Sequence, residues 1–295
     1  MAQPPAPLPA ADAADGAFEE LRAWACAQDA AARKQLRGAH PSIWRREVPD
    51  LDALQELANH PPATCLKRGK TSTVLRTTLA DGTATVLKHY LPTKRLDPRD
   101  RMGRSKAIRS LMAAEALKRR GFSVVEALGA WSVAGKGSYL LLADYPDALP
   151  MHEAVLTVQG ADRAALLANV GRTVRQLHRA GVAYRDLKPS NVLVQMPGTA
   201  CEDLLFLDHD RNRFQPQAVQ AETAMRDLAA VHAGLPPQVR ATERLLALRH
   251  YDPELLERDC WQDLMPALLQ EAAERAHRWI PHRLLGGAPA DQSSA

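Results

Sequence analysis

The stretch AYRDLKPSNVLV, residues 183–194, places three reactive side chains within six positions, directly before a run of β-branched residues. Asp186 is an acid, Lys188 a cation and Asn191 an amide, and the run that follows predicts the start of a strand. A solvated turn would explain this loop without any chemistry. Phosphoryl transfer would also explain it, because that reaction needs a base, positive charge near the phosphates and oxygen ligands for a metal ion.

A further acidic residue ends the next predicted strand. Asp208 closes the run DLLFLD, which is predicted to form a hairpin with NVLVQM. The end of this strand would then lie close to Asn191 across the hairpin. Because carboxylate and amide oxygens suit Mg²⁺, Asn191 and Asp208 are the predicted metal ligands.

Two charged residues interrupt apolar faces earlier in the chain. Lys88 lies within an apolar strand, on the same face as Tyr90. On the following predicted helix, Glu115 continues the inward-facing stripe that begins at Ile108. A buried carboxylate is costly unless it is paired, so Lys88 and Glu115 are predicted to form an ion pair. A purely structural ion pair would give the same pattern.

The elements around these residues change character along the chain. Residues 63–91 alternate as three strands; Asp81-Gly82 joins the last two, a strong hairpin signal. A helix ending before Gly121 follows, since glycine suits a left-handed cap. The runs SVVEALGAWSV and SYLLLADY predict two more strands. Beyond Pro146 the pattern is mostly helical, apart from the hairpin described above.

This order of elements predicts an α+β, two-lobed fold. An antiparallel sheet lobe with one helix would precede a mostly helical lobe that carries the catalytic-loop hairpin. The predicted parts are a disordered N-terminus at 1–16, a helical extension at 17–61, a sheet-rich lobe at 62–145, a helix-rich lobe at 146–285 and a disordered tail at 286–295.

Composition predicts a cytoplasmic protein. Of the 295 residues, 46% are hydrophobic and 24% charged, which suits a buried core in a protein without membrane-spanning segments. The four cysteines form no CxxC pair, as is typical of thiols in a reducing compartment. The first residues lack the basic and apolar regions of a secretory signal.

The net charge of +4 is unevenly distributed. Residues 94–109 carry seven basic side chains against two aspartates: Lys94, Arg95, Arg99, Arg101, Arg104, Lys106 and Arg109. Such a stretch is either a solvated face or a surface that meets a phosphate-rich acceptor or an anionic membrane leaflet. Nucleic acid is not expected as a partner, because no aromatic residues interleave the stretch.

With these motifs in place, residues 63–215 resemble the protein-kinase-like superfamily, and most closely the bacterial lipopolysaccharide core kinases of the InaA type (Kdo/heptose kinases). YRDLKPSN matches the catalytic-loop pattern H-R-D-L-x-x-x-N at every position except the first. The phrases STVLRTTLADGTATVLKHYLP, EALKRRGFSVVEALG and LFLDHDR are similar to that branch.

The resemblance implies a kinase that uses ATP and Mg²⁺. Lys88 would hold the α- and β-phosphates, and Glu115 would hold Lys88. Asp186 would be the catalytic base, with Lys188 near the γ-phosphate. The remaining implied contacts are Gly69, Ala143 and Tyr145 with the nucleotide, and Asn191 and Asp208 with the metal.

Three positions depart from the protein-kinase pattern. Tyr184 stands where histidine is usual, which would alter support of the loop more than its chemistry. DHD replaces D-F-G, so Asp210 stands at the glycine position, where it is either a second ion or substrate ligand or a solvated acid. The glycine-rich loop is reduced to Gly69, which would cradle phosphate less completely.

The predicted function is phosphorylation of a sugar hydroxyl of the lipopolysaccharide core, in the cytoplasm and in peripheral contact with the inner membrane. DLKPSN is also typical of serine/threonine protein kinases. No A-P-E motif follows Asp208, however, and Thr223 is the sole hydroxyl residue before the next helix. A protein or small-metabolite kinase and a non-catalytic pseudokinase scaffold are the alternatives.

Overall fold

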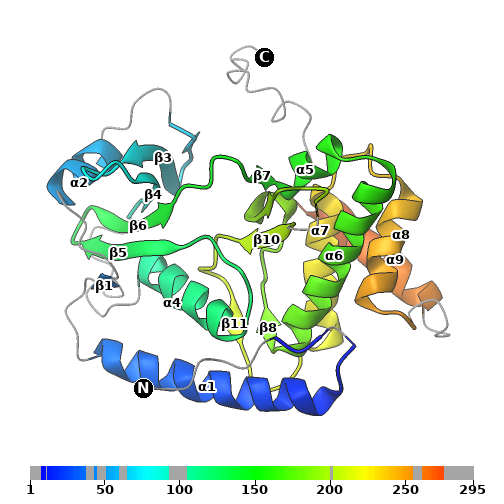
Figure 1. Cartoon of the computed structure of the whole chain (residues 1–295). Coiled ribbons are helices and arrows are strands. Elements are labelled where there is room, and N and C mark those ends of the chain that lie inside the picture. The colour runs from blue at the N-terminus through cyan, green and yellow to red at the C-terminus, as the bar shows by residue number, and fades with distance from the viewer. Residues whose placement is uncertain are drawn as a thin grey trace. The chain divides into compact units, whose positions relative to one another are not determined.

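The computed structural model of the chain describes residues 8–10, 12–37, 43–44, 51–59, 65–92, 105–199, 202–254 and 261–275. The chain divides into two compact units (Figure 1). Unit 1 comprises Met1–Leu8, Ala14–Pro146 and Leu205–Gln217, and unit 2 comprises Pro9–Ala13, Asp147–Leu204 and Ala218–Ala295. Unit 1 is built on an antiparallel sheet and unit 2 is mostly helical, which confirms the predicted α+β class.

Unit 1 contains a six-stranded antiparallel sheet in the order β1-β5-β6-β4-β3-β2. Its strands are β1 (Ile43–Trp44), β2 (Lys67–Arg68), β3 (Ser72–Thr78), β4 (Ala84–Tyr90), β5 (Ala127–Val133) and β6 (Gly137–Ala143). The predicted hairpin between β3 and β4 turns at Gly82, whose φ of 84° suits glycine. In this register Lys88 lies opposite Val74 of β3 and Leu140 of β6, in the middle of the sheet.

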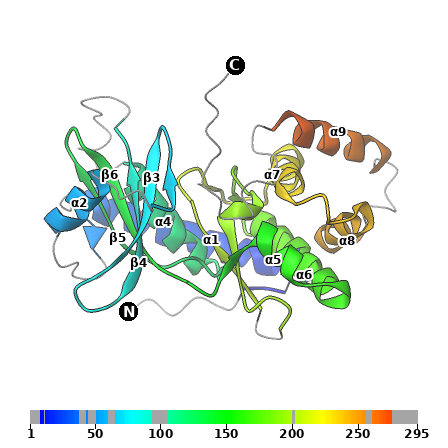
Figure 2. The ribbon, with the colours of Figure 1, turned by 90° about the horizontal axis from the view of Figure 1, so that it is seen from above.

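The two faces of this sheet pack on different helices, α2 (Leu51–Asn59) and α4 (Lys106–Arg119) (Figure 2). Leu87 and Leu141 belong to the core on the α2 face. Tyr90 and Leu140 belong to the core on the α4 face. Because side chains alternate along a strand, Lys88 points to the same face as Tyr90, toward α4.

The region 17–61, predicted to be a helical extension, contains α1 (Asp15–Arg37) and α2, and it also contributes β1 to the sheet. On α1 the buried residues are Phe18, Leu21, Ala25 and Asp29, which recur at helical spacing. The helix therefore packs along one face, and one member of that buried stripe is an acid.

Unit 2 consists of short strands and packed helices. Its elements are β7 (Leu149–Pro150), α5 (Met151–Thr157), α6 (Gly160–Arg179), β8 (Val182–Ala183), the 3₁₀ turn η1 (Pro189–Asn191), β9 (Val192–Gln195), α7 (Ala221–Gly234), α8 (Ala241–Tyr251) and α9 (Trp261–Glu274). The chain returns to unit 1 through β10 (Asp203–Phe206) and then forms β11 (Arg213–Phe214). None of the described helices is both long and apolar enough to cross a membrane.

Glycine allows two helices of unit 2 to pack closely. A Cβ atom on Gly171 of α6 would lie 2.2 Å from the carbonyl oxygen of Ala247 on α8. Helix α6 also buries Leu166, Val170 and Val174, as its sequence pattern predicts. Helix α6 thus packs closely on α8 and leads through β8 to the loop that begins at Tyr184.

Candidate active site

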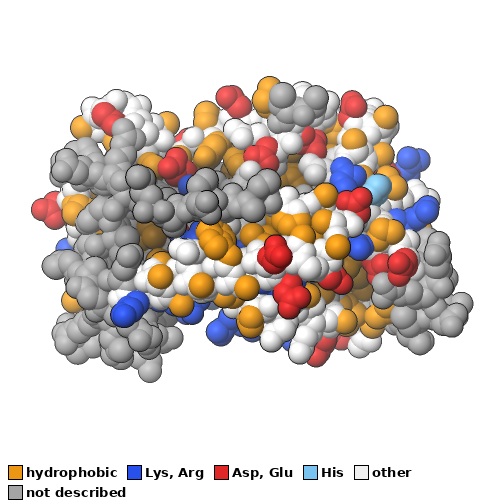
Figure 3. All heavy atoms as spheres, turned by 60° about the horizontal axis from the view of Figure 1, so that its bottom comes forward, with side chains coloured by type: hydrophobic (Ala, Val, Ile, Leu, Met, Phe, Trp, Pro, Cys, Tyr) orange, Lys and Arg blue, Asp and Glu red, His pale blue; other side chains and the backbone are white. Residues whose placement is uncertain are grey.

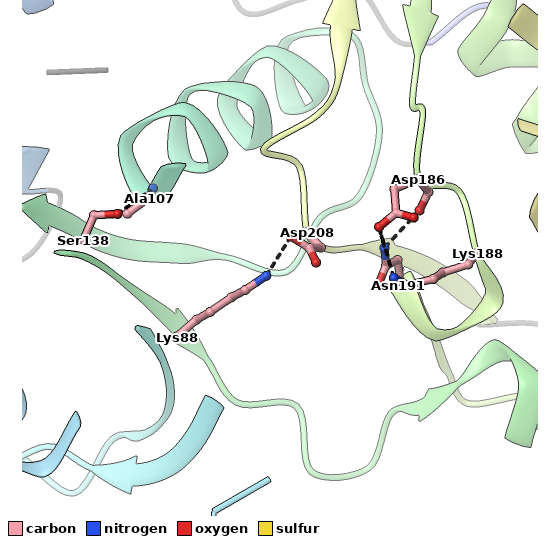
Figure 4. A network of polar contacts seen from close by, with 7 residues as sticks. All are labelled: Lys88, Ala107, Ser138, Asp186, Lys188, Asn191 and Asp208. Atoms are coloured by element: carbon pink, nitrogen blue, oxygen red, sulfur yellow. Dashed lines mark hydrogen bonds and ion pairs between the residues drawn. The ribbon is translucent and has the colours of Figure 1, made fainter. Parts of the chain in front are cut away.

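The loop at 186–191 forms a hydrogen-bonded set within unit 2 (Figure 4). The Asn191 side-chain nitrogen donates to the Asp186 backbone oxygen at 2.9 Å and to Asp186 Oδ2 at 3.2 Å. Lys188 Nζ lies 3.1 Å from the same Oδ2. The structure therefore brings together the three side chains predicted from this loop, and two of them orient the Asp186 carboxylate.

The backbone of this loop is held by a residue that sequence analysis missed. Asp227 of α7 accepts hydrogen bonds from the backbone nitrogens of Tyr184, at 2.8 Å, and Arg185, at 2.7 Å. Arg185 adopts a left-handed conformation with φ of 67°, which is unfavourable for a residue with a side chain. Because Asp227 is only 1% exposed, its carboxylate would be costly without these donors.

Asp227 lies beside His178 of α6. His178 Nε2 lies 3.4 Å from Asp227 Oδ2, and His178 Nδ1 lies 2.9 Å from the hydroxyl of Tyr251. Burial raises the pKa of Tyr251 above its ordinary value, so this hydroxyl stays protonated and can donate to Nδ1. The arrangement suits the tautomer with its proton on Nε2, facing Asp227.

The C-terminal end of α7 also approaches the loop. A Cβ atom on Gly234 would lie 2.4 Å from Cδ of Pro189, the first residue of η1. Only glycine fits there without displacing the turn that carries Asn191. Helix α7 therefore contacts this part of the chain twice: Asp227, in the middle of the helix, accepts hydrogen bonds from the backbone, and Gly234, its last residue, packs closely on Pro189.

The second group of predicted residues lies in unit 1. Lys88 Nζ forms an ion pair with Asp208 Oδ1 at 2.7 Å (Figure 4). It also lies 4.7 Å from the centre of the Tyr90 ring. Burial alone would lower the pKa of Lys88. The interactions with Tyr90 and Asp208 are stronger than this effect and raise the pKa above its ordinary value. The amine therefore stays protonated, as binding of phosphate requires.

Sequence analysis expected Glu115 as the partner of Lys88, whereas the ion pair seen in the structure joins Lys88 to Asp208. Glu115 lies on α4, the helix toward which Lys88 points, and it is half-buried there. The sequence could not reveal that a carboxylate 120 positions further along the chain reaches the tip of Lys88. An ion pair between Lys88 and Glu115 remains a prediction.

The DHD segment contains two titratable groups beside Asp208. Burial lowers the pKa of His209 to about 4, so this imidazole is neutral near pH 7. Burial also raises the pKa of Asp210, and the charge of Asp208 adds to the effect, while Lys106 and Arg109 act against it. Asp210 therefore lies within electrostatic reach of two basic residues of α4.

Those two residues are the described part of the basic stretch at 94–109. Its first five basic positions, from 94 to 104, lie outside the described residues. In the view of Figure 3, acidic and basic side chains are interspersed over the described surface. The acceptor or membrane surface predicted for this stretch therefore remains a prediction.

The predicted nucleotide contacts in unit 1 lie at strand ends. The Gly69 nitrogen donates to the Ser72 oxygen at 2.9 Å, which closes the turn between β2 and β3. The Ala143 nitrogen donates to the Glu126 oxygen at 2.9 Å, at the end of β6. Tyr145 follows and is half-buried. The contacts of Gly69, Ala143 and Tyr145 with adenine or phosphate stay predictions.

The predicted metal ligands offer oxygen donors of the type that Mg²⁺ prefers. The side-chain nitrogen of Asn191 is engaged by Asp186, so its amide oxygen is the atom that could bind a cation. Asp208 offers a carboxylate. Mg²⁺ is usually held by one or two carboxylates together with substrate phosphates, so each of these oxygens is of a type that suits it.

Comparison with solved structures finds matches that include one with a TM-score above 0.5 and one below it. WaaP in complex with acyl carrier protein has a TM-score of 0.58 at 18% sequence identity, over 79% of this chain and 98% of that one. The Rio2 kinase ADP/Mg²⁺-phosphoaspartate complex from Chaetomium thermophilum has a TM-score of 0.43 at 18% identity, over 82% of this chain and 84% of that one. At this identity the similarity to WaaP shows the fold alone.

Comparison with protein families is more specific. No curated protein sequence matches the chain at a significant level. Residues 93–264, however, match the profile of the lipopolysaccharide kinase (Kdo/WaaP) family. This match confirms the resemblance predicted from the motifs. Because the match covers more than half of the sequence, the chain belongs to the lipopolysaccharide kinase (Kdo/WaaP) family.

Proposed function

We propose that this protein transfers the γ-phosphate of ATP to a sugar hydroxyl of the lipopolysaccharide core, in a reaction that depends on Mg²⁺. The observation that carries the proposal is the hydrogen-bonded set of Asp186, Lys188 and Asn191, held by Asp227. It presents a carboxylate of fixed orientation beside a cation, which is what a phosphoryl acceptor requires.

Asp186 acts as the base. It accepts the proton of the acceptor hydroxyl while the hydroxyl oxygen forms a bond to the γ-phosphorus, and the bond from that phosphorus to the β–γ bridging oxygen breaks to release ADP. Lys188, 3.1 Å from Asp186 Oδ2, supplies positive charge for the transferred phosphate.

Lys88 and Asp208 serve the nucleotide. Lys88, which stays protonated, would bind the α- and β-phosphates, and Asp208 and the amide oxygen of Asn191 are the groups that would hold the metal. When bound, Mg²⁺ neutralises charge on the phosphates.

The acceptor follows from the family and from charge. A lipopolysaccharide core carries phosphates and carboxylates at a membrane leaflet, and the basic stretch at 94–109 suits such an acceptor. We therefore place the enzyme in the cytoplasm, in peripheral contact with the inner membrane. Protein and small-metabolite acceptors are the alternatives, and the assay below separates the glycolipid from a protein acceptor.

The test is ADP release from Mg-ATP by the full chain in three settings: without acceptor, with a generic protein substrate, and with lipopolysaccharide from a kinase-deficient mutant of the source strain. Asp186→Asn removes the base and keeps the shape of the side chain. Asp147→Asn, at an exposed aspartate of the same unit, is the matched control. Binding of ADP by each variant is measured in parallel.

We expect ADP release that only the glycolipid stimulates and that Asp147→Asn keeps. Asp186→Asn should lose about 10²- to 10⁴-fold in kcat while its nucleotide affinity is unchanged. If the protein substrate stimulated ADP release and the glycolipid did not, the proposed acceptor would be wrong and a protein would take its place. Nucleotide binding without turnover in any setting would support the non-catalytic alternative.

A further inference from the structure

The segment 205–217, which carries Asp208, is attached on both sides of Asp208 to the region where α1 meets the C-terminal end of α4. We infer that the buried pair Asp29–Arg120 positions this segment, so that Asp29 and Arg120 are positioning residues for metal binding by Asp208. The inference deepens the proposed function and rests on it. All of the residues involved belong to unit 1.

The attachment before Asp208 is made by Phe206. Its nitrogen donates to the Ser123 oxygen at 3.1 Å, and its oxygen accepts from the Val125 nitrogen at 2.9 Å. The Phe206 ring also packs edge-to-face on Phe122, with ring centres 6.4 Å apart. Residues 122–125 follow α4 directly, so the chain two positions before Asp208 is fixed to the end of that helix.

The attachment after Asp208 is made by Phe214 and Pro216. The Arg120 guanidinium lies 4.7 Å from the centre of the Phe214 ring, a cation–π contact. Arg22 of α1 donates to the Pro216 oxygen at 3.0 Å. Between the two attachments Asp208 has a left-handed backbone with φ of 64°, a conformation that persists only where its surroundings impose it.

The Arg120 guanidinium is itself held by α1. Arg120 is 0% exposed and Asp29 is 5% exposed, and Arg120 Nη1 donates to Asp29 Oδ2 at 2.8 Å. The other oxygen of Asp29 accepts from Arg119 at 2.7 and 2.9 Å. Arg120 also donates to the Ala116 oxygen at 2.9 Å, and its Nη2 lies 3.6 Å from Cys26 Sγ. Asp29 therefore fixes the position of the buried Arg120 guanidinium.

This arrangement is more than a device for stability. A buried ion pair can often be replaced by apolar residues without loss of stability, so stability alone does not call for one here. The cation–π contact, by contrast, needs a charge at a defined place over the Phe214 ring. Asp29 thus acts on Arg120, Arg120 acts on Phe214, and Phe214 limits the motion of the loop that carries Asp208.

Two variants test the inference against a matched control. Phe214→Leu removes the cation–π contact and keeps the Asp29–Arg120 pair. Asp29→Asn weakens the pair itself. Glu19→Gln, at an exposed position of α1, is the control. For each full-length variant we would measure ADP affinity by calorimetry over a series of Mg²⁺ concentrations, and backbone hydrogen exchange across residues 205–217.

Both variants should raise the Mg²⁺ concentration needed for tight ADP binding by about tenfold, the usual effect of removing support from a metal ligand. Affinity for ADP without Mg²⁺ should be unchanged. The backbone amide hydrogens of residues 209–214 should exchange faster in both variants than in wild type. In Glu19→Gln they should exchange at the wild-type rate.

An unchanged Mg²⁺ dependence in folded Phe214→Leu would overturn the inference, whatever Asp29→Asn does, because Phe214 is the last link to the Asp208 loop. If Asp29→Asn does not fold, Phe214→Leu decides alone. If the wild-type protein binds ADP with Mg²⁺ and both variants bind it with the same affinity, only this inference is rejected. A wild-type protein that binds no ADP at any Mg²⁺ concentration rejects the proposed function, and the inference with it.

Discussion

The carboxylate of Asp227 accepts a 2.7 Å hydrogen bond from the backbone nitrogen of Arg185, the residue directly before Asp186. The same carboxylate holds the nitrogen of Tyr184, so one side chain of α7 fixes two consecutive peptide groups. In this way a helix that contributes no predicted catalytic residue determines the direction in which the proposed base leaves the backbone.

Replacing Asp227 should therefore damage activity through the loop. Asp227→Asn keeps the size of the side chain but turns one acceptor oxygen into a donor that faces a backbone N–H. One buried donor is left unsatisfied, so the free energy of unfolding should fall by about 1–3 kcal/mol. Turnover should fall while KM for ATP changes little. Urea denaturation and steady-state kinetics measure the two effects, and Glu222→Gln at the exposed first turn of α7 should leave both within error.

Replacing Asp208 should affect nucleotide binding rather than proton transfer. In Asp208→Asn, affinity for ADP should lose its dependence on Mg²⁺, because an amide is a much weaker ligand for this cation than a carboxylate. Asp186→Asn should keep that dependence. Calorimetric titration of ADP with and without Mg²⁺ distinguishes the two variants. If Asp208→Asn retained a wild-type response to Mg²⁺, the predicted metal ligand would be wrong.

Replacing Lys88 should weaken the binding of phosphates. Lys88→Met keeps much of the aliphatic chain and removes the charge that pairs with Asp208. A hydrogen bond to a charged group contributes about 1.5–3 kcal/mol, so affinity for ATP should fall by roughly 10- to 100-fold. Lys136→Met, in the exposed turn between β5 and β6, is the control. Equal ATP affinity in the two variants would exclude Lys88 as a phosphate ligand.

Tyr139 should contribute to alkaline unfolding. Burial raises the pKa of Tyr139 from 10.0 to about 12, although its hydrogen bond to Asn59 acts the other way. The native state therefore keeps this proton where the unfolded chain has lost it. The resulting stability is complete below pH 10 and is lost as the pH rises toward 12. Urea denaturation between pH 8 and about 11.5 should show that the free energy of unfolding falls less with rising pH in Tyr139→Phe than in wild type. If the free energy of unfolding fell equally in the two proteins, groups other than Tyr139 would be responsible for the alkaline unfolding.

The fold could be predicted from local sequence signals. Asp81-Gly82 marks the β3–β4 hairpin, and Gly121, with φ of 83°, ends α4 as its type suggests. These features depend on backbone preferences of a few neighbouring residues. The loop set of Asp186, Lys188 and Asn191 could be found for the same reason, since all three lie within one turn of chain.

Contacts between distant segments could not be predicted in the same way. The partner that the structure gives Lys88 is Asp208, and nothing in the sequence near Lys88 points to it. Asp227 did leave a signal, because it lies among the buried positions Ala224 and Ala230 of α7. A buried acid on a helix of apolar spacing implies a partner, and here the donors are backbone groups, which a sequence does not reveal.

Both Arg185 and Asp208 have left-handed backbone conformations. Glycine would adopt them without the steric penalty, which is about 1–2 kcal/mol for other residues. A thermostability screen that reads only folding would therefore tend to enrich glycine at both positions. The two substitutions would have different effects. Glycine at position 185 keeps the backbone nitrogen that donates to Asp227. Glycine at position 208 removes the carboxylate. Selection for heat resistance alone could thus yield a well-folded protein that lacks the proposed metal ligand, so a stabilised variant should keep aspartate at position 208.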